Sequence, residues 1–152
     1  RSLKGSKHIW WFRIQDTNDI NRFVKIAVAE KQPADFFSVY RGRPIMLEAK
    51  TSRNLTSFPL YYASTPAIAK HQISAGVKLE RMGGISLILI RREEFRNKKC
   101  YAISAQQAKD LYSNKDNKKS IKWSWFEENA YIVERLKAPL RWNLHKLYEQ
   151  II

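Results

Sequence analysis

The sequence predicts an α/β fold with a mixed central β-sheet flanked by helices. Residues 34–40 and 44–50 are two strand-length runs joined around Arg41-Gly42-Arg43, a helix is bracketed within 66–82, and residues 85–90 are almost wholly apolar. With an earlier strand near residues 9–15, this order of strands and helix is typical of α/β proteins. A chain of 152 residues is too short for two ordinary domains, so we expect one domain over 1–152.

Local signals support each of these elements. Thr65-Pro66 is typical of a helix start, and Gly83-Gly84 of a helix stop. Between them, Ala69, Ile73, Gly76 and Val77 share one face, which we expect to pack on the sheet. The apolar run 85–90 is typical of a strand covered on both faces. We also expect a strand at 100–103, helices at 105–112 and 142–152, a loop at 51–65, and one possible helix around 20–29.

The charge of the chain indicates a polyanionic partner. Lys and Arg total 28 against 14 Asp and Glu, and the net charge is +14. The excess lies in the first 122 residues, so the last thirty are expected to be scaffold. DNA or RNA phosphate is the natural counterpart, because neutralised phosphates release condensed counterions. A merely solubilising basic surface is the alternative.

Other functional classes are disfavoured by composition. No apolar stretch approaches the roughly 20 residues that cross a bilayer, so we expect no membrane partner. The single Cys100 has no partner for an internal disulfide, which together with the polar start of the chain favours the cytoplasm. Three scattered histidines and one cysteine match no zinc-site spacing, and we expect no small-molecule cofactor.

The hairpin at 34–50 carries the candidate metal-binding and catalytic residues. If its turn is Arg41-Gly42, paired positions sum to 83, and Asp35 then faces Glu48 at a Cβ separation of roughly 5 Å. Lys50 emerges on the same face. Two facing carboxylates repel each other unless a cation lies between them, and oxygen ligands suit Mg²⁺, with Mn²⁺ as a substitute.

Two interpretations of this trio stay open at this point. One is a metal site at which a phosphodiester is polarised, and the other is an ordinary ion pair of Lys50 with Glu48 or Asp35 on a solvated strand face. A three-residue turn would move Glu48 to the opposite face from its partner.

A family resemblance bears on that choice. Pro33-Ala34-Asp35, twelve residues and then Glu48-Ala49-Lys50 resemble the signature of the PD-(D/E)XK nucleases. The surrounding residues resemble Holliday-junction resolvases of the RecU type and their archaeal-type and phage relatives, chiefly over residues 33–91. The matching segments are Val39-Tyr40-Arg41-Gly42-Arg43, Thr56-Ser57-Phe58-Pro59-Leu60, His71-Gln72-Ile73 and Gly83-Gly84-Ile85.

The resemblance implies a restriction-endonuclease-like core and a dimeric, Mg²⁺-dependent endonuclease that nicks four-way DNA junctions. Asp35, Glu48 and the carbonyl of Ala49 would be metal ligands, Lys50 the catalytic lysine, and Gln72 a support for the site. The superfamily usually has a further glutamate on an N-terminal helix, and none of the acidic residues ahead of Asp35 supplies it. We therefore expect that helix to be missing before residue 1.

We assign six basic residues near the motif to phosphate contacts and not to base recognition, since junctions are recognised by shape. They are Arg41, Arg43, Arg53, Lys70, Lys78 and Arg81. A plain solvated charge is the alternative for each of them. Two other functions stay open: a different nuclease on the same scaffold (restriction, repair or flap-type), or a DNA-binding module of this fold that has lost catalysis. The five tryptophans are expected to be mostly core.

Overall fold

The computed structural model describes residues 9–13, 32–94, 98–114, 116, 119–136 and 141–152. The helix considered around residues 20–29 lies outside these ranges.

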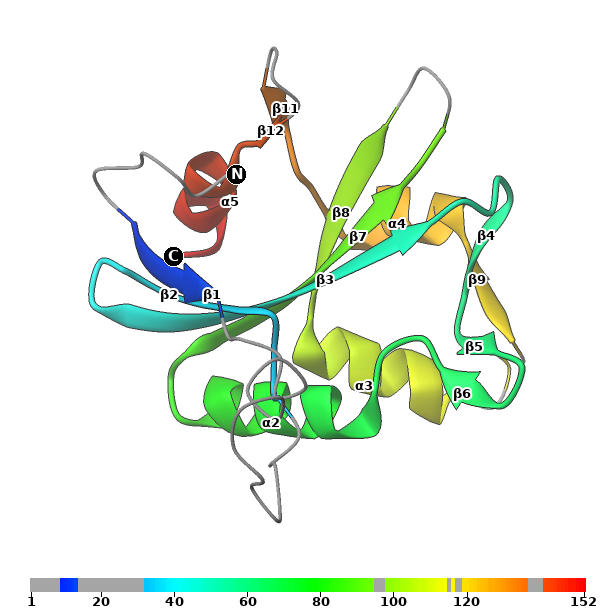
Figure 1. The fold of residues 1–152 in the computed structure, drawn as a ribbon, viewed down its shortest axis with the longest axis horizontal. Coiled ribbons are helices and arrows are strands. Elements are labelled where there is room, and N and C mark those ends of the chain that lie inside the picture. The colour runs from blue at the N-terminus through cyan, green and yellow to red at the C-terminus, as the bar shows by residue number, and fades with distance from the viewer. Residues whose placement is uncertain (1–8, 14–31, 95–97, 115, 117–118, 137–140) are drawn as a thin grey trace, which may run out of the picture.

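A mixed β-sheet forms the centre of the protein (Figure 1). Within the described residues its strand order is β1-β2-β3-β7-β8-β10. Only β3 and β7 pair in parallel there, and every other neighbouring pair is antiparallel. The strands are β1 (Trp10–Arg13), β2 (Phe36–Tyr40), β3 (Arg43–Ser52), β7 (Ile85–Arg92), β8 (Lys99–Ser104) and β10 (Tyr131–Ile132). The predicted α/β class with a mixed sheet is confirmed.

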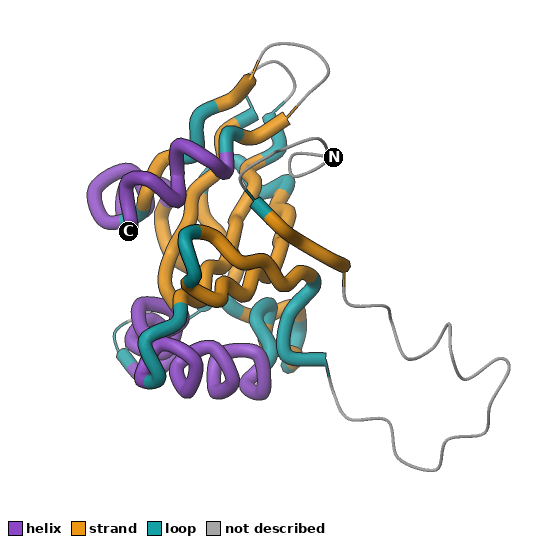
Figure 2. Tube along the Cα trace, turned by 90° about the vertical axis from the view of Figure 1, so that its left-hand side faces the viewer, coloured by secondary structure: helices purple, strands orange, loops and turns teal. Residues whose placement is uncertain are grey.

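Helices cover both faces of this sheet. Helices α2 (Lys70–Arg81), α3 (Ala105–Ser113) and α4 (Trp123–Asn129) pack on one face, and α5 (Leu144–Ile151) packs on the other. Figure 2 shows the strands between the C-terminal helix and the pair α2 and α3. Successive side chains of a strand point to opposite faces, so Ile88 and Ile90 join one core while Ile85 and Leu87 join the other. This confirms that β7 is covered on both sides.

Helix α2 begins later than the sequence signals predicted. Thr65–Pro66 forms β6, which pairs with β5 (Tyr61–Tyr62), so the proline belongs to a small hairpin and not to a helical first turn. The helix starts after Ala69, whose backbone N–H donates to the Gln72 side chain at 3.1 Å. The predicted stop holds, since Gly83 adopts a φ of +86°.

The face of α2 expected to pack inward does so. Ile73, Gly76 and Val77 are buried, and Gly76 lies so close to Ser86 and Ala105 that a Cβ there would be 2.5 Å from the Ala105 Cβ. The bare backbone of Gly76 therefore allows α2 to approach the sheet and α3 closely.

The segment expected to be a loop at 51–65 contains short strands instead. Its first two residues extend β3, and Phe58 and Leu60 are buried. The pattern of the segment does not reveal β4, because its pairing partner β9 is distant in sequence. The remaining elements are β4 (Ser57–Pro59), β9 (Ser120–Lys122), β11 (Arg135–Leu136) and β12 (Arg141–Trp142).

The C-terminal helix packs into the core, and the scaffold role expected for the last thirty residues stays a prediction. Leu144, Leu147 and Tyr148 of α5 are buried against the sheet, and Trp142 lies in β12 ahead of the helix. Trp123 is core, whereas Trp10 is exposed. In the described part of the chain, no helix is long and apolar enough to cross a membrane.

Candidate active site

A two-residue turn sets the register of the hairpin that carries the candidate site. Arg41 and Gly42 have φ values of +48° and +77°, as a tight turn of the I′ kind requires. Tyr40 pairs with Arg43 and Phe36 with Leu47, so paired positions sum to 83 as predicted. The ladder ends at Phe36, and the N–H of Asp35 donates to the Leu47 carbonyl at 3.1 Å, one position out of this register. This bond holds Asp35 against β3 beside Glu48, but the ladder does not pair the two residues directly.

Glu48 is a buried carboxylate with one unsatisfied oxygen. Its Oε1 pairs with the Lys50 Nζ at 2.7 Å, while its Oε2 is buried and has no hydrogen-bond partner among the described residues. Burial raises the pKa of the Glu48 carboxyl, the charge of Asp35 raises it further, and Lys50 opposes both effects. A buried oxygen without a hydrogen-bond donor destabilises the fold, and a functional role for Glu48 would explain why it is present.

Asp35 is close enough to Glu48 for their charges to interact, which supports the expected proximity of the two carboxylates. Its Oδ2 accepts the backbone N–H of Ala49 at 2.9 Å. This bond locks the carboxylate against β3 beside Glu48. The metal contact expected from the Ala49 carbonyl oxygen stays a prediction.

Lys50 and Gln72 connect the hairpin to α2. The Lys50 ammonium donates to the Gln72 Oε1 at 3.4 Å, in addition to its pairing with Glu48. Gln72 also accepts the Ala69 N–H, so the residue that caps the helix also orients the lysine. Its neighbour His71 turns away and contacts the Gln32 carbonyl oxygen at 3.0 Å. The structure thus brings together Asp35, Glu48, Lys50 and Gln72.

The residues present fit a hard divalent cation. Asp35 and Glu48 supply two carboxylates, and the Oε2 of Glu48 offers a lone pair that no donor among the described residues uses. No group of three or more His, Cys, Asp or Glu side chains suited to a metal occurs in the described residues. A cation held here would therefore keep several water ligands, as Mg²⁺ commonly does.

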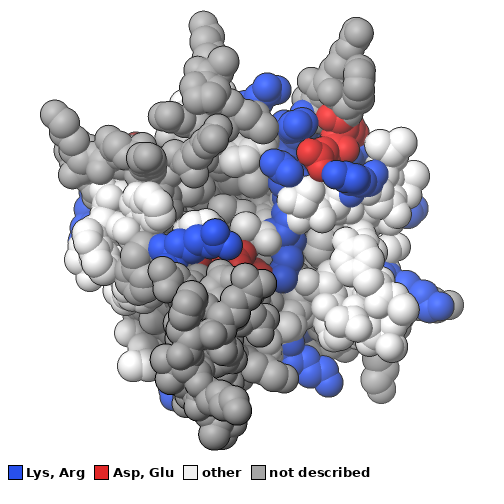
Figure 3. All heavy atoms as spheres, viewed as in Figure 1, with Lys and Arg blue, Asp and Glu red and all other residues white. Residues whose placement is uncertain are grey.

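The predicted phosphate-contact residues are spread over the molecule. Arg41 lies at the hairpin tip, over the Tyr40 ring and 3.6 Å from Glu149 of α5. Arg43 is five residues from Glu48 along β3, a separation of roughly 16 Å in an extended strand. Arg53 follows β3 at the other end and pairs with Glu93 at 3.4 Å, with most of its side chain exposed. On the face of the molecule drawn in Figure 3, which is the view of Figure 1, basic side chains border small acidic patches.

The other three of these residues line a hollow between α2 and α3. Lys70, Lys78 and Arg81 belong to its rim. Arg81 comes nine residues after Gln72, which is about half a turn around the axis at 100° per residue. This hollow and the candidate site therefore lie on different sides of α2.

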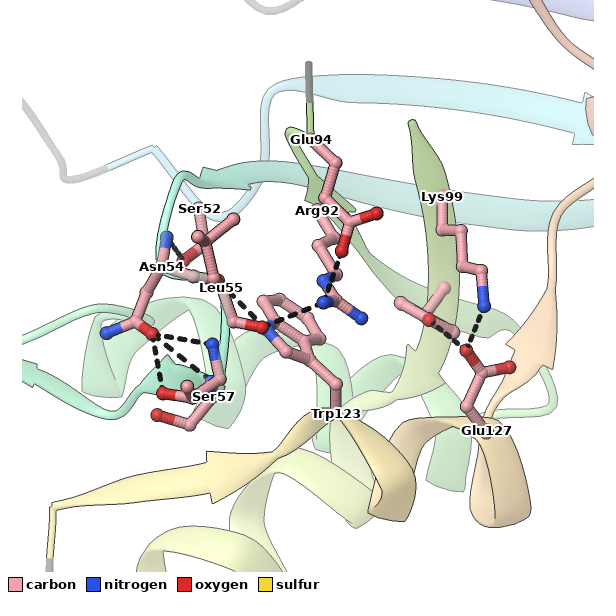
Figure 4. A network of polar contacts seen from close by, with 11 residues as sticks. Ser52, Asn54, Leu55, Ser57, Arg92, Glu94, Lys99, Trp123 and Glu127 are labelled. Carbon is pink, nitrogen blue, oxygen red and sulfur yellow. Dashed lines mark hydrogen bonds and ion pairs between the residues drawn. The ribbon is translucent and has the colours of Figure 1, made fainter. Parts of the chain in front are cut away.

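Sequence reasoning missed the contacts that hold the segment after β3 (Figure 4). The Asn54 side chain accepts from the N–H groups of Thr56 and Ser57, which folds the segment into a tight turn. The Trp123 indole donates to the Asn54 carbonyl at 2.9 Å, and Arg92 donates to the Leu55 carbonyl at 2.7 Å. Trp123 is about seventy residues away in sequence, so only the Asn54 turn had a local signal.

Glu80 is a second residue that sequence reasoning missed. Its carboxylate accepts the backbone N–H groups of Ala105 and Gln106 at 2.9 and 3.1 Å, which caps the start of α3 from α2. Burial nevertheless raises the pKa of the Glu80 carboxyl. The bond fixes α3 relative to the helix that carries Gln72.

The chain matches the family model described as RecU, Recombination protein U, over residues 7–148. It belongs to the RecU family. Among curated relatives, Holliday junction resolvase RecU of Shouchella clausii is 35% identical over 111 residues, covering 73% of this chain and 47% of that protein. The RecU resolvase of Pediococcus pentosaceus is 33% identical over 108 residues, covering 70% and 50%. This chain thus spans about half the length of these relatives.

Among solved structures, a Holliday junction resolvase, Hjc of Archaeoglobus fulgidus, matches with a TM-score of 0.48 at 13% identity. That match covers 82% of this chain and 83% of the archaeal one.

Proposed function

We propose that this RecU-family chain is a Mg²⁺-dependent endonuclease that resolves four-way DNA junctions by nicking phosphodiester bonds. The observation that carries the proposal is the Glu48 carboxylate, buried beside Asp35 and Lys50, whose Oε2 has no hydrogen-bond partner in the part of the chain that the structure describes. Family membership supports it, and so do relatives named as Holliday junction resolvases. The net charge of +14 suits a nucleic-acid substrate.

In this proposal each residue has a distinct task. Asp35 and Glu48 would hold the cation, together with the Ala49 carbonyl. When bound, Mg²⁺ supplies Lewis-acid activation of the scissile phosphate and of a water molecule. Lys50, oriented by Glu48 and Gln72, stabilises the extra negative charge that develops on the phosphate in the transition state.

The arginines provide binding and not chemistry. Arg41, Arg43 and Arg53 lie along the hairpin and its exit, where they contact phosphates of the junction arms. The protein acts as a homodimer, because paired nicks on opposing strands require two copies of the site. A native mass measurement with and without junction DNA tests this assembly.

The function is tested on a synthetic four-way junction and a linear duplex of the same sequence, each with Mg²⁺, Mn²⁺ or EDTA. We expect nicking of the junction alone, and only with a divalent ion. Asp35→Asn keeps an oxygen that accepts the Ala49 N–H, yet removes the charge, so nicking is expected to fall at least about 100-fold. The matched control is Asp110→Asn, a change on the exposed surface of α3.

Each contrary outcome removes one part of the proposal. Equal cutting of linear duplex rejects the junction substrate and favours another nuclease on this scaffold. Full activity of Asp35→Asn rejects the site. Junction binding without any nicking, in the longest natural form of the protein, identifies a DNA-binding module that has lost catalysis.

A further inference from the structure

A preformed groove lies on the outer side of α2, away from the candidate active site. It has a volume of about 800 Å³ and is bordered by α2, α3 and the small β5–β6 hairpin. Figure 1 shows these elements side by side below the sheet. The lining residues are Tyr61, Pro66, Ile68, Lys70, Ile73, Ser74, Val77, Lys78, Arg81, Lys109, Tyr112 and Ser113.

The floor of the groove is apolar and rigid. Ile68, Ile73 and Val77 are buried and belong to the core between α2 and the sheet. Tyr112 is fixed by two hydrogen bonds, since its hydroxyl donates to the Leu60 carbonyl at 2.8 Å and accepts the Ile68 N–H at 3.0 Å. Tyr61 packs edge-on against the Tyr112 ring at 5.6 Å. Such a floor takes apolar side chains with little reorganisation.

The rim of the groove is cationic. Lys70, Lys78, Arg81 and Lys109 are exposed, and within the described residues none of the four forms an ion pair. No Asp or Glu occurs among the described residues that line the groove. The combination complements a ligand that is anionic at its edges and apolar at its centre.

The position and chemistry of the groove argue against nucleic acid as its occupant. Arg81 and Gln72 are on opposite sides of α2, so this helix separates the groove from the candidate active site at Glu48. DNA bound at that site would have to pass around α2 to reach the groove. A phosphate backbone also gains nothing from a recessed apolar floor. We propose that the groove binds an acidic segment of a partner protein, whose apolar side chains fill the floor while its carboxylates meet the rim.

The test uses fluorescence anisotropy of a labelled decapeptide in which Asp and Glu alternate with Leu and Phe. Two control peptides replace either the acids with Asn and Gln, or the apolar residues with Ser. The protein variants are Lys109→Glu on the rim and Ser74→Trp, which fills the groove from an exposed helix position. Lys122→Glu, on exposed β9, is the charge-matched control. Circular dichroism verifies folding of each variant.

We expect Lys109→Glu and Ser74→Trp each to weaken binding of the acidic peptide at least about fivefold, and Lys122→Glu to leave it within twofold. Both control peptides bind more weakly, and an added four-way junction does not displace the acidic peptide. Equal losses in Lys109→Glu and Lys122→Glu would indicate general electrostatic attraction and overturn the proposal. Displacement by the junction, together with weaker junction binding by Lys109→Glu, would assign the groove to DNA instead.

Discussion

Two Glu–Lys ion pairs in this protein have almost equal lengths, but the pKa of the glutamate is shifted in opposite directions. In the β3 pair, Lys50 lies 2.7 Å from Glu48, which is buried and has a raised pKa. One oxygen of Glu48 has no hydrogen-bond partner among the described residues. In the β8–α4 pair, Lys99 lies 2.6 Å from Glu127. Tyr101 also donates to the Glu127 carboxylate at 2.6 Å, and the two donors lower its pKa. Distance alone therefore does not distinguish a pair that stabilises the fold from one suited to chemistry.

The comparison is tested most strongly by removing each charge in turn. Glu48→Gln is expected to lower junction nicking at least about 100-fold, because it removes the proposed metal ligand. The free energy of unfolding of this variant should change by no more than about 1 kcal/mol, because the loss of the ion pair is offset by removal of the cost of burying a charge. Glu127→Gln should nick within threefold of wild type. Nicking assays and urea unfolding measure both, and equal activity of the two variants contradicts the distinction.

Substitution of Gly76 tests whether the position of α2 supports the Glu48–Lys50 pair of β3. Gly76→Ala places a Cβ against Ser86 and Ala105, which displaces α2 and with it the Gln72 that contacts Lys50. We expect a loss of about 1–3 kcal/mol in unfolding free energy and reduced nicking. Ser74→Ala, two residues earlier on the exposed side, is the control and should change stability by less than about 0.5 kcal/mol. A stable, fully active Gly76→Ala would show that close approach of α2 is dispensable.

The smallest effect is expected at the β8–α4 pair. Tyr101→Phe removes one donor to Glu127 and should lower the free energy of unfolding by about 1 kcal/mol at neutral pH.

The pH dependence of stability tests the same pair. The lowered pKa of Glu127 means that its carboxylate stabilises the fold above pH 4.5, its ordinary pKa, and that this stabilisation is lost as the pH falls below that value. The difference in stability between wild type and Glu127→Gln should therefore shrink in acid. A difference that grows on acidification contradicts this assignment.

The parts of the site that follow from local rules could be predicted from the sequence. Arg41-Gly42 allows a tight turn, which fixes the register of Phe36–Tyr40 on Arg43–Leu47, and the period of two along β3 then places Lys50 on the face of Glu48. The turn also brings Asp35 close to Glu48, although the ladder does not pair the two directly. The apolar run of β7 and the Gly83 stop of α2 are similarly local. The family resemblance, and not the spacing, supplied Gln72.

The parts that depend on distant contacts could not be predicted. The start of α2 was misplaced because Pro66 pairs with Tyr61 in a hairpin, which overrides its preference for a helical first turn. Helix α4 has no side-chain cap at Lys122 and was missed, although Trp123 and Phe126 anchor it in the core. The groove beside α2 required the placement of α3, which depends on the carboxylate of Glu80.

The unsatisfied oxygen of Glu48 has a consequence for engineering this protein. Natural sequences keep costly groups where function requires them, and selection for heat resistance alone places no value on that requirement. A library of variants screened only for survival at high temperature is therefore expected to tolerate uncharged replacements at position 48. Screens for a more heat-resistant variant need to select for the proposed nicking activity in the same round.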